Sequence, residues 1–160
     1  MAGSNIDTNG VIVTCGQCGK ANRLRFATLN RQTRCANCKN ELAAAAAPIE
    51  VPDAAVFDAM AQQSVLPVLV DFWAPWCGPC RMVAPELERV ARANAGRYLV
   101  VKVNTDVATE VAARFRIQSI PTLALLSGGR EVQRVSGVRP AAEIEKFVTQ
   151  ALASNERRAS

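Results

Sequence analysis

The chain has 160 residues, of which 49% are hydrophobic, enough for one ordinary core and a small appendage. It carries a net charge of +5 and no histidine, which excludes Cys/His metal sites and histidine as a general base. Its longest apolar run is far shorter than the roughly 20 residues that span a bilayer, and no signal-peptide pattern is present, so we expect a cytoplasmic protein without a membrane anchor.

Residues 1–42 are predicted to form a small metal-binding domain. They contain two CxxC pairs, which are Cys15, Cys18, Cys35 and Cys38. Each CxxC loop can place two sulfur atoms on one side of a metal, so two loops complete a tetrahedral zinc site. Residues 11–42 are polar and contain few aliphatic residues, so we expect them to need the metal in order to form a core.

The role of this site has alternatives that the spacing leaves open. Iron in the same cage, or two disulfides, would use the same four cysteines. A closed four-ligand site favours a structural zinc, and the functional alternative is a redox switch in which oxidation of the thiolates ejects the metal. Gly16, Gly19 and Asn37 tolerate the positive-φ turns that such loops require.

Positive charge is concentrated in the first part of the chain, with +4 on residues 1–47 and +1 on the remainder. Such asymmetry can mark a nucleic-acid-binding arm. Four thiolates around one zinc would lower the charge of this segment to +2, and Phe26 is the only aromatic residue in residues 11–42. We therefore expect no nucleic-acid partner.

The remainder of the chain alternates between strand and helix patterns. Residues 43–48 are Ala-rich and predicted to be a linker that ends at Pro48. The elements predicted after it are strand 49–51, helix 54–64, strand 66–73, helix 78–94, strand 98–103, helix 107–115, strands 122–126 and 131–136 joined by a glycine turn, and helix 141–153. This order predicts an α/β domain over residues 49–153, with a central mixed sheet, helices on both faces and a solvated tail at 154–160.

The third CxxC pair, Cys77 and Cys80, follows a strand expected to be buried and opens a helix. The unpaired N–H groups at a helix N-terminus stabilise a thiolate, so we expect a lowered pKa at Cys77. Pro79 suits the first helical turn because it lacks an N–H group. Cys80 lies one turn further on the same face, close enough to form a disulfide but deeper.

The stretch "VDFWAPWCGPC" from Val70 to Cys80 resembles the thioredoxin family. The segments "KVNTD" from Lys102, "SIPT" from Ser119 and "VSGV" from Val135 occur in the same order as in that family. The resemblance covers residues 49–153 and implies a thioredoxin fold. With the cysteine-rich extension, the whole chain resembles the zinc-containing bacterial type, thioredoxin 2.

The resemblance also implies roles for individual residues. Cys77 would attack a substrate disulfide, and Cys80 would be the resolving thiol. Asp71 would accept the Cys80 proton, as a desolvated carboxylate with raised pKa can, and Lys102 would modulate its charge. The substrate would lie against a surface made by Trp76, Gly78, Pro79, Ile120, Pro121, Gly137 and Val138. The resemblance implies a cis bond between Ile120 and Pro121.

The implied activity is that of a thiol-disulfide oxidoreductase that reduces protein disulfides. Electrons would come from NADPH through thioredoxin reductase, with no bound organic cofactor, and we expect a monomer. The Gly78-Pro79 dipeptide favours a reductant over the alternative of an oxidant or isomerase. A further alternative is a zinc module that binds nucleic acid or a partner and carries the thioredoxin-like domain as a scaffold.

Overall fold

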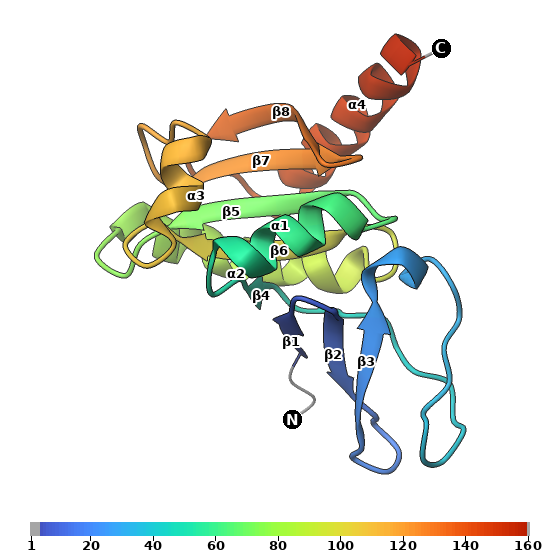
Figure 1. Ribbon diagram of the computed structural model, residues 1–160. Helices are drawn as coiled ribbons and strands as arrows, with labels where there is room; N and C mark the ends of the chain where they lie inside the picture. Colours follow the sequence, from blue (N-terminus) through green and yellow to red (C-terminus); the bar gives the residue numbers. More distant parts are fainter. Residues whose placement is uncertain (1–3, 160) are drawn as a thin grey trace.

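The structure is a computed structural model that describes residues 4–159. Its main sheet has five strands in the order β4-β6-β5-β7-β8 (Figure 1). The strands are β4 (Ile49–Glu50), β5 (Val68–Trp73), β6 (Leu99–Asn104), β7 (Thr122–Ser127) and β8 (Arg130–Ser136). Strands β4 and β5 run parallel to β6, whereas β7 is antiparallel to both β5 and β8. The mixed sheet predicted from the sequence is therefore confirmed.

Helices cover both faces of this sheet (Figure 1). They are α1 (Ala54–Gln63), α2 (Gly78–Ala93), α3 (Thr109–Arg114) and α4 (Ala141–Ala159). Alternate residues of β5 serve the two layers: Val70 packs in the cluster that contains residues of α1 and α3, and Leu69 packs in the cluster that contains residues of α2 and α4. Asp71 follows the alternation of Leu69 and so lies on the α2 and α4 face.

Two details of the predicted elements were tested by the structure. The turn between β7 and β8 has positive φ at both Gly128 (61°) and Gly129 (82°), as a two-residue hairpin turn requires. The last helix extends to Ala159, so its predicted end near Ala153 was wrong. No glycine or proline interrupts residues 154–159, and nothing in that stretch stops a helix. None of the helices within residues 4–159 is sufficiently long and apolar to cross a membrane.

Residues 4–42, the N-terminal module, form a small antiparallel sheet in the order β1-β2-β3. Its elements are β1 (Ser4–Asp7), β2 (Gly10–Thr14), β3 (Ala21–Arg25) and the 3-10 turn η1 (Phe26–Thr28). None of these three strands was predicted: β1 and β3 are short and mostly polar, and β2, although rich in valine and isoleucine, has only five residues.

The N-terminal module packs directly on the main domain. Phe26 is 1% exposed and belongs to the same buried cluster as Val51 and Phe57, and its carbonyl accepts a 3.1 Å hydrogen bond from the Val65 N–H. Strand β1 contacts β4, so the module covers the end strand of the main sheet (Figure 1). Covering an end strand protects backbone groups that could otherwise pair with another chain.

The Ala-rich segment 43–48 also lies against the protein. Ala45 packs on the shared buried cluster, and Ala46, Ala47 and Pro48 line a cavity together with α2 and Lys102. The segment thus holds the N-terminal module in place as well as connecting it.

Candidate functional site

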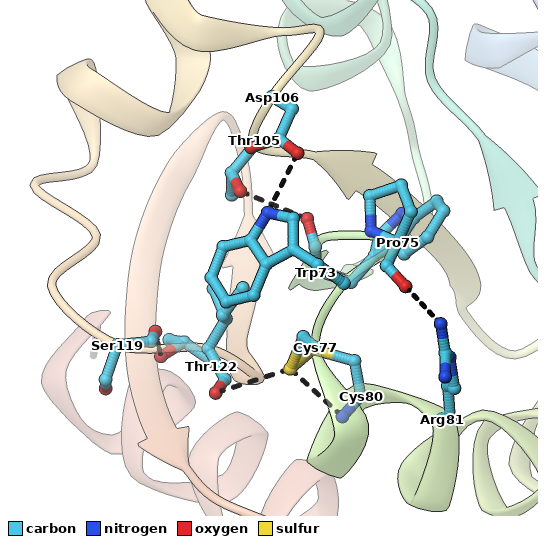
Figure 2. The surroundings of a disulfide bond; sticks show 11 residues. Trp73, Pro75, Cys77, Cys80, Arg81, Thr105, Asp106, Ser119 and Thr122 are labelled. Atoms are coloured by element: carbon cyan, nitrogen blue, oxygen red, sulfur yellow. Dashed lines mark hydrogen bonds between the residues drawn. A yellow bond between two sulfur atoms is a disulfide. The ribbon is translucent and has the colours of Figure 1, made fainter.

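Cys77 and Cys80 form a disulfide where β5 gives way to helix α2 (Figure 2). Their Cα atoms are 5.3 Å apart, a separation typical of disulfides. Cys77 is the N-cap residue of α2, and its Sγ accepts a 3.2 Å hydrogen bond from the Cys80 N–H. A backbone donor and the positive end of the helix dipole would stabilise a thiolate at Cys77 once the disulfide is reduced.

The two cysteines differ in surroundings rather than in exposure. Both are 4% exposed, so the greater depth expected for Cys80 does not appear as lower exposure. The Cys77 Sγ lies 3.8 Å from the carbonyl oxygen of Ile120, and the Ile120–Pro121 peptide is cis, as the resemblance implied. Cys77 therefore faces a neighbouring loop, whereas Cys80 lies inside the first turn of α2.

The residues proposed for substrate contact are largely at the surface around this disulfide. Trp76 is 68% exposed, Val138 is 41% exposed, and Gly78, Pro79 and Gly137 are also exposed. Ile120 is half-buried and packs against the disulfide, and Pro121 is buried. The Gly137 N–H donates a 3.0 Å hydrogen bond to the Pro121 carbonyl, which brings the end of β8 to the cis peptide.

Asp106 orients Trp76 and was not predicted as a site residue. Its Oδ2 accepts a 3.0 Å hydrogen bond from the Trp76 Nε1. The only feature of the sequence that pointed to Asp106 as a site residue was its place in the "KVNTD" segment. On the other side of the disulfide, Arg81 donates a 2.8 Å hydrogen bond to the Pro75 carbonyl. These two contacts fix the loop that carries Trp76.

Asp71 is the buried acid of the site. It is 1% exposed, and its Oδ1 has no hydrogen-bond partner among the residues that the structure describes. Burial raises the pKa of Asp71 to about 7, and the positive charge of Lys102 opposes the shift. The two residues are in register on neighbouring parallel strands. Asp71 can therefore hold or release a proton near neutral pH.

Lys102 and Trp73 complete the surroundings of this acid. The Lys102 Nζ lies 4.2 Å from the centroid of the Trp73 ring. Trp73 packs against the disulfide, and its Nε1 donates a 3.4 Å hydrogen bond to Glu50 Oε2. Glu50 was not predicted as a site residue, because its position beside Lys102 depends on strand pairing.

The four remaining cysteines meet in the N-terminal module. Their Sγ atoms all lie within 4.8 Å of one another, with 3.7 Å between Cys15 and Cys38 and 3.6 Å between Cys18 and Cys35. Tetrahedral zinc with bonds of about 2.3 Å would separate its sulfur ligands by about 3.8 Å. The donor set and its spacing fit zinc.

The two loops that carry these cysteines have matching hydrogen bonds. The N–H of Gly19 bonds to the Cys15 carbonyl, and that of Lys39 bonds to the Cys35 carbonyl. Positive φ occurs at Gly19 (79°), as predicted, and at Lys39 (64°). The predicted positive φ at Gly16 and Asn37 was wrong, because the left-handed residue in each loop follows its second cysteine.

Asn22 supports the second loop and was also not predicted. Its Nδ2 donates to Cys35 Sγ at 3.4 Å, while its Oδ1 accepts a 3.0 Å bond from the Ala36 N–H. Hydrogen bonds from the Cys38 backbone and from Asn22 lower the pKa of the Cys35 thiol to about 6. The thiolate is the form that binds metal.

Comparisons with known proteins agree with this geometry. A family model described as thioredoxin matches residues 48–150. The chain is 53% identical over 91 residues to thioredoxin 1 of Nostoc sp., covering 54% of this chain and 85% of that protein. It is 37% identical over 143 residues to thioredoxin C-3 of Corynebacterium nephridii, covering 89% of this chain and 96% of that protein. A solved structure of a mutant thioredoxin from Halobacterium salinarum superimposes with a TM-score of 0.63 and 27% identity, covering 69% of this chain and 95% of that one.

The raised pKa of Asp71 predicts how stability depends on pH. The native state holds the Asp71 proton up to about pH 7, whereas the unfolded chain loses it near the ordinary value of 3.8. Stability is therefore lost as pH rises from about 4 to about 7. Asp71→Asn has no titrating group at this position and so avoids this loss. The free energy of unfolding of Asp71→Asn minus that of the unchanged protein should therefore be about 3 to 4 kcal/mol larger at pH 8 than at pH 4.

Urea unfolding of the two disulfide-bonded proteins at both pH values measures this difference. Asp106→Asn is the matched control, because Asp106 is exposed and should show no such increase. A difference between Asp71→Asn and the unchanged protein that stays constant with pH would show that Asp71 is not a buried acid with a raised pKa.

Proposed function

Because this chain belongs to the thioredoxin family, we propose that it reduces disulfide bonds in other proteins through Cys77 and Cys80. Membership of the family makes the chain a thiol-disulfide oxidoreductase. The proposal adds the direction of the reaction and the residues that perform it. The observation that carries it is the Cys77–Cys80 disulfide, placed at the N-terminus of α2 beside a cis-proline.

The first step is attack by the Cys77 thiolate on one sulfur of a client disulfide. A mixed disulfide forms between Cys77 and the client, and the other client sulfur leaves as a thiolate. The Cys80 N–H and the dipole of α2 favour the attacking thiolate. Trp76 and Val138 offer exposed apolar surface to the client, and the backbone of Ile120 beside Cys77 offers a carbonyl group to an extended segment.

The second step releases the reduced client. Cys80 gives its proton to Asp71 and attacks the Cys77 sulfur, so the Cys77–Cys80 disulfide forms and the client leaves with its second thiolate. The client gains two electrons, which the dithiol loses. Asp71 suits the role of acceptor because its pKa of about 7 lies near neutral pH, and Lys102 limits the cost of its charge. The disulfide in the structure corresponds to the end of this cycle.

The oxidised protein must then be reduced again. We propose that a thioredoxin reductase does this with electrons from NADPH, and that the protein acts as a cytoplasmic monomer. The four unpaired cysteines of the N-terminal module suit a reducing compartment, where free thiols persist.

We also propose that the N-terminal module holds one zinc ion, as in the zinc-containing type of the family, thioredoxin 2. Cys15, Cys18, Cys35 and Cys38 would be its ligands. A bound zinc would supply a charge that holds four thiolates together, and it would stabilise the fold of the module. The sulfur separations and the Asn22 hydrogen bond to Cys35 support this assignment.

The division of work between Cys77 and Cys80 can be tested by trapping. Cys80→Ser leaves Cys77 able to attack but removes the thiol that resolves the mixed disulfide, so client proteins should accumulate on the chain. Cys77→Ser should trap none. Non-reducing gels of the two full-length variants, exposed to a disulfide-containing protein, measure the adducts. Equal trapping by both variants would refute the assignment.

The metal site can be tested by metal analysis of purified protein, which should contain about one zinc per chain. Cys18→Ser should lose this zinc, because it removes a ligand at an exposed position where packing is little changed. Cys77→Ser/Cys80→Ser is the matched control and should keep it. Removing zinc with a chelator should also lower the free energy of unfolding. Loss of metal from the control variant, or its retention in Cys18→Ser, would contradict the assignment.

A further inference from the structure

Glu50 lies in a row of charged residues that includes the buried acid of the redox site. It is in register with Lys102 on the neighbouring strand β6, and Lys102 is in register with Asp71 on β5. Residues in register on parallel strands point to the same face of a sheet, so an acid, a base and an acid follow one another across three strands. Ile49 and Val51, on either side of Glu50, are buried in the cluster of the opposite face.

Trp73 links the members of this row. It lies two residues after Asp71 on β5 and therefore faces the same side of the sheet. Its Nε1 donates a 3.4 Å hydrogen bond to Glu50 Oε2, and its ring centroid is 4.2 Å from Lys102 Nζ. The indole thus holds the Glu50 carboxylate at its edge and the Lys102 ammonium over its face. Strand register therefore places Lys102 between Glu50 and Asp71 rather than beside Asp71 alone.

We propose that Glu50 is a positioning residue for the redox reaction, which keeps Lys102 shared between two carboxylates so that the buried Asp71 is only partly neutralised. This inference rests on the proposed role of Asp71 as the acceptor of the Cys80 proton. A lysine committed to Asp71 alone would stabilise its charged form and make it a weaker proton acceptor. Glu50 opposes this in two ways, because it competes for Lys102 and because its own negative charge raises the pKa of Asp71.

The other elements packed around Asp71 contribute little net charge, so Glu50 and Lys102 are the main charged groups near it. Leu123, in register with Asp71 on β7, is apolar and buried, and the buried residues of α4 are also apolar. Helix α2 contributes the Cys80 sulfur and, beside Lys102, the exposed side chains of Glu88 and Arg92. Those two bear opposite charges, so their fields oppose one another.

The test is the titration of the Asp71 carboxyl carbon, followed by NMR in the full-length, disulfide-bonded protein. Glu50 and Asp71 are two strand spacings apart, roughly 10 Å. Glu50→Gln should move the midpoint of Asp71 to lower pH by about half a unit to one unit. Glu50→Asp keeps the charge but shortens the side chain. Its Asp71 midpoint should lie close to that of the unchanged protein, even where the hydrogen bond to Trp73 is lost.

Glu88→Gln is the matched control, since it removes the same charge from the wall of the cavity beside Lys102 but outside the row. It should move the Asp71 midpoint by less than half as much as Glu50→Gln. An unchanged midpoint in Glu50→Gln, or equal shifts in Glu50→Gln and Glu88→Gln, would overturn the inference. The titration needs no turnover, so the two proposals can fail separately. An unchanged Asp71 midpoint in Glu50→Gln, together with normal trapping of client by Cys80→Ser, refutes this inference alone. A shifted midpoint without trapping by Cys80→Ser refutes the proposed function alone.

Discussion

A carboxyl group buried in the middle of a sheet is the constraint on which the redox site depends. Desolvation disfavours the charged form of Asp71, and its Oδ1 has no hydrogen-bond partner within residues 4–159. The sheet places Lys102 directly beside it, so the charge is tolerated but not strongly stabilised. The result is an acid that titrates near neutral pH, beneath a helix that begins with the two redox cysteines. Such an arrangement costs stability, and groups with strongly perturbed pKa values of this kind cluster at functional sites.

Strand β4 connects this site to the rest of the molecule. Although it has only two residues, Ile49 packs in the core shared with the N-terminal module and Glu50 lies in the charged row on the opposite face. Strand β1 of the module contacts the same strand. The module therefore supports the edge strand that carries Glu50, while its own four cysteines form a separate cluster.

Strong local patterns made most of the main domain predictable from the sequence. Apolar strands, helical periodicity and the Gly128–Gly129 turn each constrain a short segment, and the CxxC spacing predicted which four cysteines would meet. Features that depend on pairing between distant segments were missed. The place of Glu50 in the row follows from the register of three strands, and the burial of Phe26 follows from the docking of the module on the sheet. Asn22 and Asp106 act through side-chain hydrogen bonds to residues far away in the sequence, Asn22 to Cys35 and Ala36 and Asp106 to Trp76, which no local pattern specifies.

The central claim is that Asp71 accepts the proton that Cys80 must lose. The most direct measurement is the rate at which Cys80 resolves a preformed mixed disulfide on Cys77, followed from pH 5 to pH 9 in the unchanged protein and in Asp71→Asn. The unchanged protein should show a rate that rises with a midpoint near 7, where Asp71 becomes able to accept a proton. Asp71→Asn should lack this rise and be slower at pH 8 by about 100-fold or more. Superimposable profiles for the two proteins would contradict the claim.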